Sequence, residues 1–415
     1  MFRSKSDISI CSKMNDKITS LHGIGNLDGL LSLRLRGNQI ETINFGGTSL
    51  HRLSDLDLKD NRIRGVQNLQ QLNSLSALNL DNNDLDSFSS DGHDPMWTLK
   101  HLKLSGNKLN SIDVSQFPDL RLLYLDRNRL GTVTGLLKAK HLDSLSMREQ
   151  QNGVAIDQSF LSEAFEVRKL FLSGNLLTSF QPRVHFLNLQ YLELANCGLE
   201  TLPPDFGQMV LNTRVLNLNF NALRDIQPLL GIVRLKRLQL AGNRLTRLRL
   251  TTTVLSQFPT LSSVDLRNNP LTIGFYPPVI ERSMVVHEAK EADAVNADPY
   301  ILGDANVERD EKYASCLDMD TRMLRRVFDI LIVQSCPRLK ILDGHGVNKA
   351  IAELRDQVWD KLVEDGVVNA PLVAVGEAVV QNSNDGKKEA LSEESSEKQD
   401  AVEVVPEAER EDPVP

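Results

Sequence analysis

Leucine and polar residues alternate along most of this chain in one recurring pattern, LxxLxLxxNxL. The pattern occurs eleven times at steps of 21 to 26 residues, and leucine fills 29 of the 33 slots at its first three leucine positions. The LxL part repeats every second residue, which is typical of a strand with one buried face. A single unit cannot bury that face alone, so the pattern predicts stacked units that share one core. The units begin at Leu30, Leu53, Leu75, Leu99, Leu120, Leu142, Val167, Leu189, Thr213, Leu235 and Leu261.

A polar slot follows each predicted strand, and asparagine fills it in nine of the eleven units. The chain turns at this point and leaves backbone groups inside the stack, where a side-chain amide can bond them. Cys197 takes the slot once, and we expect a structural thiol there. Gln150 takes it in the sixth unit, where the step to the next unit is 25 residues, so we expect a bulging loop after it.

Units of this length and pattern are leucine-rich repeats. We therefore predict an α/β repeat solenoid: a leucine-rich-repeat horseshoe with a parallel concave sheet, a C-terminal cap and a disordered acidic tail. The predicted segments are a degenerate or uncapped start (1–17), eleven repeats (18–276), a loop insertion (277–318), a terminal helix with a capping half-repeat (319–346), a further helix (347–369) and the tail (370–415).

The predictions for the two ends of the array depend on weaker sequence patterns. Helical apolar spacing over 319–335 predicts a helix that covers the last strand, since an exposed sheet edge invites aggregation. Residues 348–366 have the spacing of one amphipathic helix that ends at Gly366. Residues 1–17 offer no convincing cap, so either a degenerate half-unit covers that edge or the chain is the C-terminal portion of a longer protein. We favour the second alternative.

Charge and cysteine content indicate which classes of function and which cell compartment fit this chain. The formal net charge is −8, and residues 376–415 alone carry twelve acidic against four basic groups, which leaves the rest neutral. A neutral repeat array argues against nucleic-acid binding through phosphate neutralisation. Four scattered cysteines without metal-ligand spacing favour a reducing compartment, the cytoplasm or the nucleus. The first residues lack the apolar region of a secretory signal, and the longest apolar stretch near the C-terminus is too short to span a membrane.

Enzyme chemistry is not indicated by any motif. The sequence has no GxxxxGK[ST], HExxH or GxSxG, and its eight histidines do not cluster with cysteines or paired carboxylates. We therefore expect no catalytic residue, no cofactor and no metal, and predict that the chain is not an enzyme.

The strand positions between the leucines predict the binding surface. These side chains point out of the concave face, and equivalent positions of successive units form columns. Apolar and aromatic residues gather in the middle of the array, and such groups are typical of binding hot spots. The alternative is that they pack on one another or are covered by the insertion or the tail. The predicted partner-binding residues are Lys103, Leu122, Tyr124, Arg148, Lys169, Phe171, Tyr191, Glu193 and Val215.

Two stretches resemble known families. The repeats followed by CPRLKILDG resemble the SDS-twenty-two-like class of phosphatase regulators, including its C-terminal cap. More narrowly, KITSLHGIGNLDGLLSLRLRGNQIETI, LSDLDLKDNRI and RRVFDILIVQSCPRLKILDG are similar to the fungal spindle-pole-body scaffolds of the septation initiation (mitotic exit) network and their centrosomal relatives. This resemblance covers roughly residues 18–345.

The resemblance implies a non-catalytic scaffold that binds a small-GTPase regulatory module and kinases at the spindle pole body. This sequence lacks the long N-terminal region of that family, which puts kinase recruitment through that region in doubt. The alternative hypothesis is a phosphatase regulatory subunit that holds the catalytic subunit on its concave face.

Overall fold

A computed structural model describes residues 10–21, 27–89, 94–151, 153, 156–177, 179–277 and 298–367. All of them belong to one compact unit, Met1–Val368. The predicted tail and residues 278–297 of the predicted insertion lie outside the described residues. None of the described helices is long and apolar enough to cross a membrane.

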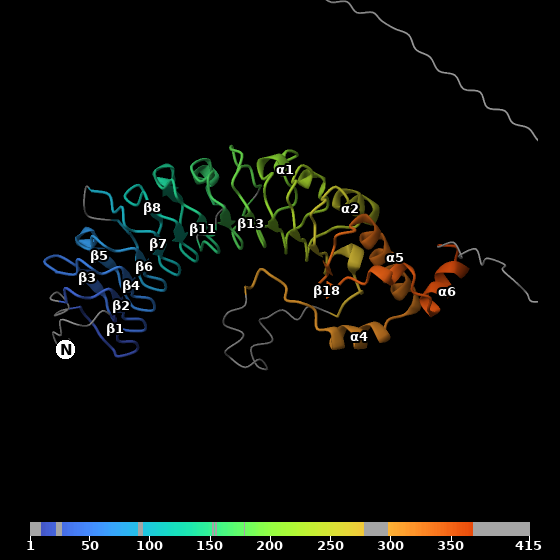
Figure 1. Cartoon of the computed structure of the whole chain (residues 1–415), viewed down its shortest axis with the longest axis horizontal. Coiled ribbons are helices and arrows are strands. Elements are labelled where there is room, and N and C mark those ends of the chain that lie inside the picture. Colours follow the sequence, from blue (N-terminus) through green and yellow to red (C-terminus); the bar gives the residue numbers. More distant parts are fainter. Residues whose placement is uncertain are drawn as a thin grey trace, which may run out of the picture. The chain divides into compact units, whose positions relative to one another are not determined.

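One sheet of 14 strands forms the spine of this compact unit, counted over the described residues. All neighbouring strands are parallel except the last pair, and they follow one another along an arc (Figure 1). Leu33, Leu56 and Leu78 stand opposite one another in register, as the repeat predicts. In sheet order the strands are β1 (Ile10–Ser12), β2 (Ser32–Arg34), β4 (Asp55–Asp57), β6 (Ala77–Asn79), β7 (His101–Lys103), β9 (Leu122–Tyr124), β11 (Ser144–Ser146), β12 (Lys169–Phe171), β13 (Tyr191–Glu193), β14 (Val215–Asn217), β15 (Arg237–Gln239), β16 (Ser263–Asp265), β17 (Ile341–Leu342) and β18 (His345–Gly346).

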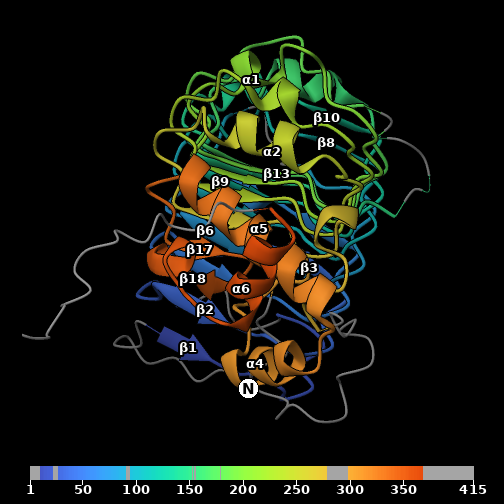
Figure 2. The same cartoon turned by 90° about the vertical axis from the view of Figure 1, so that its right-hand side faces the viewer.

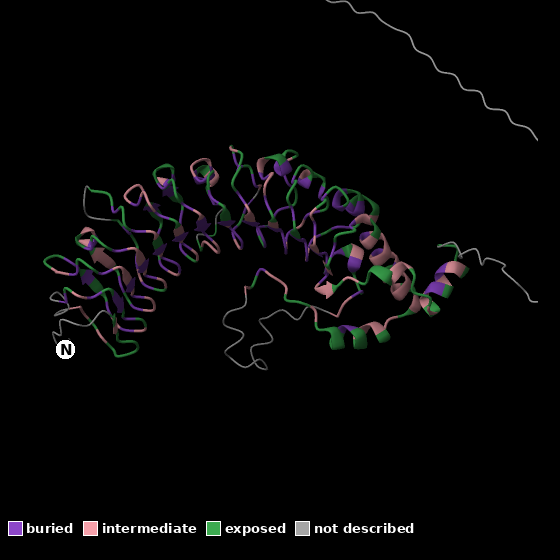
Figure 3. Cartoon of the chain, viewed as in Figure 1, coloured by how far each residue is buried: buried purple, intermediate pink, exposed green. Residues whose placement is uncertain are grey.

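The aliphatic core runs unbroken through the stack behind this sheet. The second and third leucine positions of each unit are at most 2% exposed, from Leu33 and Leu35 to Val264 and Leu266. Figure 3 shows the buried positions along the inside of every coil and the exposed ones at the turns. Thr213, the polar exception, is buried with the leucines. The predicted solenoid is confirmed.

Buried amides connect neighbouring coils. Asn128 donates hydrogen bonds to the carbonyls of Leu104 (3.0 Å) and Leu125 (2.9 Å) and accepts one from the Leu109 N–H (3.1 Å). Asn61, Asn83, Asn107, Asn221, Asn243 and Asn269 repeat this arrangement, and Asn38 and Asn175 bond the neighbouring coil as well. These bonds satisfy backbone groups that would otherwise be buried without partners.

The two exceptional units solve the same problem with other side chains. Gln150 donates from Nε2 to the Leu125 carbonyl (2.9 Å) and accepts from the Leu130 N–H (3.1 Å), so a longer amide does the asparagine's work. Cys197 places Sγ 3.5 Å from the carbonyl of Leu172, and burial raises the pKa of this thiol to about 12. Residues 152, 154 and 155 of the expected bulge lie outside the described residues.

The convex side carries short returns of several kinds. Single 3-10 turns occur at η1 (Leu69–Gln71), η2 (Leu136–Lys138), η3 (Gln158–Ser162), η4 (Gln227–Leu229) and η5 (Pro270–Thr272), and helices at α1 (Phe206–Met209) and α2 (Leu248–Leu255). Two small parallel sheets pair β3 (Thr42–Asn44) with β5 (Gly65–Gln67) and β8 (Ser111–Asp113) with β10 (Thr132–Thr134).

The C-terminal end is closed by α5 (Met319–Ser335), which packs beside α2 across the end of the stack (Figure 2). Strand β17 then adds to β16, and β18 turns back on it. The structure differs here from two predictions. Residues 277–318 include the helix α4 (Val307–Ser315). The single helix of 347–369 is instead η7 (Lys349–Ala352) and α6 (Gln357–Glu364), because Asp356 caps α6 and pairs with Arg326.

The N-terminal end carries one strand more than the eleven predicted repeats supply. Strand β1 pairs in parallel with β2, and Asn38 bonds the carbonyl of Lys13 (2.7 Å) and the N–H of Ile18 (3.0 Å). Residues 10–18 therefore form a further coil of the stack, and all but the last of them lie in the range 1–17 predicted to be a degenerate or uncapped start.

Candidate functional site

Strand register brings eight of the nine predicted binding residues into two adjacent columns on the concave face. The first column holds Lys103, Tyr124, Phe171 and Glu193 on successive strands, with Ser146 between Tyr124 and Phe171. The second column holds Leu122, Lys169, Tyr191 and Val215, with Ser144 between Leu122 and Lys169. Arg148 follows β11 and reaches the first column from the turn.

Aromatic rings in these columns contact one another and nearby cations. The ring centroids of Phe171 and Tyr191 are 4.9 Å apart. The Lys103 ammonium lies 5.6 Å from the Tyr124 ring centroid, and the Arg148 guanidinium lies 4.9 Å from that of Phe171. Tyr124, Phe171 and Tyr191 all remain half-buried, so each keeps part of its surface open.

A segment of the same chain, residues 298–303, lies over the C-terminal half of this face; we call it the strap (Figure 1). The Tyr300 side chain is only 6% exposed, and its hydroxyl donates to Glu149 (2.7 Å). The amides of Asn217 and Asn219 both donate to the Tyr300 carbonyl, at 2.9 and 3.0 Å. Further along, Arg267 donates to the carbonyl of Gly303 (3.1 Å).

Beneath the strap, Arg148 bridges two carboxylates. Its Nη2 lies 2.6 Å from Glu193 Oε2 and 2.9 Å from Asp298 Oδ2. Burial raises the pKa of Glu193, which has no exposed surface, although Arg148 acts in the opposite direction. The structure thus differs from the prediction that Arg148 and Glu193 face solvent: both are engaged inside the chain, because the strap covers this part of the face.

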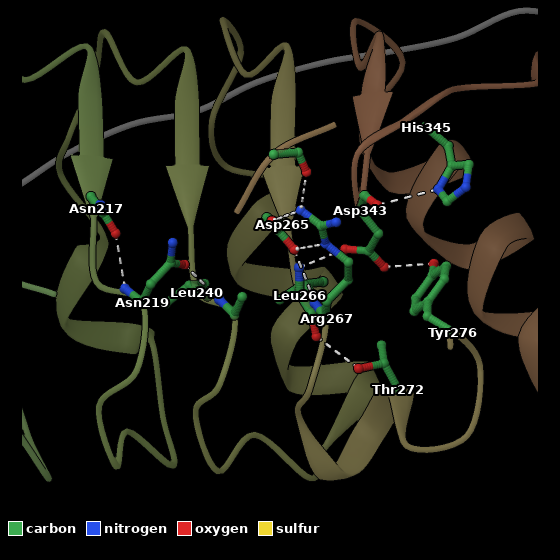
Figure 4. Close-up of polar contacts among 12 residues, drawn as sticks. Asn217, Asn219, Leu240, Asp265, Leu266, Arg267, Thr272, Tyr276, Asp343 and His345 are labelled. Carbon is green, nitrogen blue, oxygen red and sulfur yellow. Dashed lines mark hydrogen bonds and ion pairs between the residues drawn. The ribbon is translucent and has the colours of Figure 1, made fainter. Parts of the chain in front are cut away.

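A second buried polar cluster fastens the C-terminal cap to the last repeat (Figure 4). Asp343 accepts hydrogen bonds from the Leu266 N–H and from the Tyr276 hydroxyl (2.7 Å), and Arg267 pairs with Asp265 at 2.6 Å. Burial, and secondarily the charge of Asp265, raise the pKa of Asp343. The cluster holds the end of the solenoid together. No group of three His, Cys, Asp or Glu residues in the described part of the chain could hold a metal ion.

The part of the concave face that the strap leaves open contains a hollow of about 580 Å³ at the edge where the chain enters β9, β11 and β12. We call it the rim hollow. It brings together four of the predicted residues, Leu122, Tyr124, Lys169 and Phe171. The other residues that line it are His101, Arg121, Lys140, His141, Leu142, Asp143, Ser144, Glu166, Arg168 and Asn188.

The repeat pattern predicts the columns, whereas cover by the insertion stood only as the alternative to an open binding surface. The columns follow from the repeat register alone, whereas the strap comes from a segment without period, in which Asp298 lies 150 residues beyond its partner Arg148. One signal was available: Tyr300 is an isolated aromatic residue in an otherwise acidic and small-residue stretch, next to Asp298 and Pro299. The polar residues that bind the strap, Asn217 and Asn219, lay in positions that the repeat leaves variable.

Comparison with known proteins places the chain among repeat proteins. A Leucine Rich Repeat family model matches residues 188–209. The septation initiation network scaffold protein cdc11 of Schizosaccharomyces pombe is 33% identical over 321 residues, which are 75% of this chain and 30% of that protein. Leucine-rich repeat serine/threonine-protein kinase 1 of Mus musculus is 29% identical over 49% of this chain and 14% of its own length. The chain thus spans less than a third of either relative.

Solved structures share the fold at low sequence identity. A chain of the octameric complex of Latrophilin 3, Unc5D and the FLRT2 leucine-rich repeats matches 64% of this chain and 85% of its own length, with a TM-score of 0.53 and 21% identity. The functional domain of InlJ from Listeria monocytogenes matches 82% of this chain and 63% of its own, with a TM-score of 0.52 and 18% identity. The chain has a leucine-rich-repeat fold, and three quarters of it is similar to a scaffold protein of the septation initiation network.

Proposed function

We propose that this chain is a non-catalytic interaction scaffold in septation initiation (mitotic exit) signalling. It acts in the cytoplasm at the spindle pole body, and its partners there are a small-GTPase regulatory module and kinases. The observation that carries the proposal is the 33% identity to a septation initiation network scaffold along 75% of the chain. A repeat array suits this role, because stacked coils present a long preformed surface. Binding to such a surface costs little conformational entropy in the array.

The binding surface in this proposal is the uncovered part of the concave face. Leu122, Tyr124 and Phe171 offer apolar area there, and Lys103 and Lys169 lie beside them. Aromatic residues at the centre of a patch contribute most of the affinity in protein interfaces, while charges at the rim steer association. Tyr191 and Val215 extend the surface toward the strap. Arg148 and Glu193 join it only when the strap moves away.

Affinity capture of the tagged full chain from dividing cells tests the proposal. The informative variant is Leu122→Glu/Tyr124→Glu, which places two carboxylates in the patch. The matched control is Leu137→Glu/Leu187→Glu, because those leucines are 56% and 63% exposed elsewhere on the surface. We expect wild type and control to retain septation-network proteins and the patch variant to lose them.

Two results would contradict the proposal. One is stoichiometric recovery of a protein phosphatase catalytic subunit in place of network proteins, which would favour the regulatory-subunit hypothesis. The other is recovery of network proteins that the patch variant does not reduce.

A further inference from the structure

A row of basic side chains follows one rim of the concave sheet, at the residue just before each strand. The carbonyl of this residue accepts the N–H groups of the equivalent residue in the next coil and of the first strand residue after it, as Arg121 does for Asp143 and Ser144 (2.9 and 3.0 Å). Equivalent positions in neighbouring coils therefore lie one strand spacing apart, ~4.8 Å. From the fourth unit to the cap the position is filled by Lys100, Arg121, Asp143, Arg168, Gln190, Arg214, Lys236, Ser262 and Lys340.

Six of these nine residues are lysine or arginine, and we call those six the basic row. Lys100 is half-buried and the other five are exposed. Arg168 has a neighbouring acid, Asp143, at 3.6 Å, in a pair that is itself exposed. The remaining five basic side chains form no ion pair with the described residues. The row is therefore a line of charge open to a ligand.

The basic row meets the rim hollow at Arg121 and Arg168, which line it. The hollow itself has four lysines or arginines against two acids, Asp143 and Glu166, and its floor includes Leu122, Tyr124 and Phe171. Positive charge and apolar surface are thus adjacent. A ligand that matches both would carry several negative charges in line and at least one apolar group among them.

We propose that the basic row and the rim hollow bind an extended acidic segment of a partner protein, with its carboxylates along the row and an apolar side chain in the hollow. This inference rests on the proposed function, whose partner it characterises. The row spans about 24 Å from Arg121 to Lys236, in five steps of ~4.8 Å, which an extended peptide of about eight residues covers.

The pattern of charges favours a peptide over a nucleic acid. Asp143, Gln190 and Ser262 interrupt the row, and Glu166 lines the hollow with Asp143. A peptide can place uncharged residues opposite these positions, whereas a phosphate backbone presents charge at every step. Basic and acidic residues are also equal in number outside residues 376–415, so the array as a whole has no net attraction for phosphates.

Fluorescence anisotropy with a defined probe tests the inference on the full chain. The probe is a labelled synthetic peptide in which glutamates alternate with serines around a central leucine–phenylalanine pair. A version with glutamine for glutamate, a polythymidine strand and anionic phosphatidylserine vesicles are the comparison ligands. We expect the glutamate peptide to bind and the glutamine peptide to bind at least about tenfold more weakly. Added salt should lower the affinity of the glutamate peptide more than that of the glutamine peptide.

Charge-reversal variants locate the binding. Arg121→Glu/Arg168→Glu and, outside the hollow, Arg214→Glu/Lys236→Glu should each weaken the glutamate peptide about tenfold. The control Arg62→Glu/Arg129→Glu makes the same charge change at exposed arginines that directly follow the buried Asn61 and Asn128, away from the row, and should leave binding unchanged. Thermal melting of each variant shows whether it folds. If Arg121→Glu/Arg168→Glu does not fold, Arg214→Glu/Lys236→Glu provides the test.

Several outcomes would overturn the inference. They are equal binding of the glutamate and glutamine peptides, equal losses in the row and control variants, and tighter row-dependent binding of polythymidine or of vesicles. Failure here is separable from failure of the proposed function: if Leu122→Glu/Tyr124→Glu still abolishes capture of network proteins while row variants do not, the scaffold role stands and the acidic-segment inference falls.

Discussion

Single buried amides hold neighbouring coils at a fixed spacing. Asn128 has no exposed surface, and its three shortest hydrogen bonds link backbone groups of two successive coils. Its loss would leave two carbonyls and one N–H group buried in the core without this hydrogen-bond partner. Cys197 makes only long thiol contacts in the equivalent slot, so the same truncation removes much less there.

Asn128→Ala should therefore lower the free energy of unfolding by about 3 kcal/mol, because buried backbone groups lose their partners. Cys197→Ala should cost about 1 kcal/mol, since a thiol is a weak donor. Chemical denaturation of the two variants beside wild type measures both values. Equal costs would contradict the role assigned to the amide.

Asp343 gives the fold a pH dependence. Its raised pKa means that the folded state favours the protonated carboxyl, so the stability it contributes is fully present below the ordinary carboxyl pKa of about 4 and is lost as pH rises through the raised value. Asp343→Asn cannot ionise, can still accept from the Leu266 N–H, and tolerates the positive φ of 54° at this position.

Asp343→Asn should gain thermal stability relative to wild type between pH 4 and pH 8, by up to about 1.4 kcal/mol for each pKa unit of the shift. Melting curves of both proteins over this range give the difference. A difference that stays constant with pH would show that Asp343 does not titrate in the folded protein.

At the scale of elements, the strap decides how much of the concave face is open. Tyr300 is its anchor, through ring burial, its hydroxyl bond to Glu149 and the amides that bond its carbonyl. Tyr300→Ala should loosen residues 298–303 while leaving the repeats folded, because the strap forms none of the core strands. Tyr300→Phe removes only the hydroxyl and is the matched control.

Hydrogen exchange measures this opening. We expect faster exchange of amides in the strap of Tyr300→Ala, near wild-type exchange in Tyr300→Phe, and a stability loss of about 1–2 kcal/mol in the alanine variant. Unchanged exchange in Tyr300→Ala would mean that other contacts hold the strap in place.

The elements also show which parts of the structure the sequence can predict. The strands, the buried asparagines that connect neighbouring coils and the helix α5 follow from periodicity, because periodicity reports local burial. Helix α5 has the predicted bounds of 319–335. Gln150 is recognisable as the counterpart of these asparagines only once the repeat register is known. The strap, α4 and the break between η7 and α6 depend on contacts between distant residues, such as Arg148 with Asp298 and Arg326 with Asp356, which no local period encodes.

At the scale of the whole molecule, a continuous aliphatic core supports one inner surface whose two halves differ. The strap occupies the C-terminal half, and the half around β9 to β12 keeps Leu122, Tyr124 and Phe171 open beside the basic row. Stability and binding should therefore be separable, because the core leucines and the concave columns lie on opposite sides of the same strands.

The most direct test compares partner affinity and thermal stability in Tyr124→Ala and Phe171→Ala against wild type, with the network protein captured by the full chain as ligand. We predict a melting temperature near that of wild type and a loss of affinity of at least about tenfold, as expected for aromatic residues at the centre of an interface. Lower stability with unchanged affinity would contradict the claim that this inner surface binds the partner.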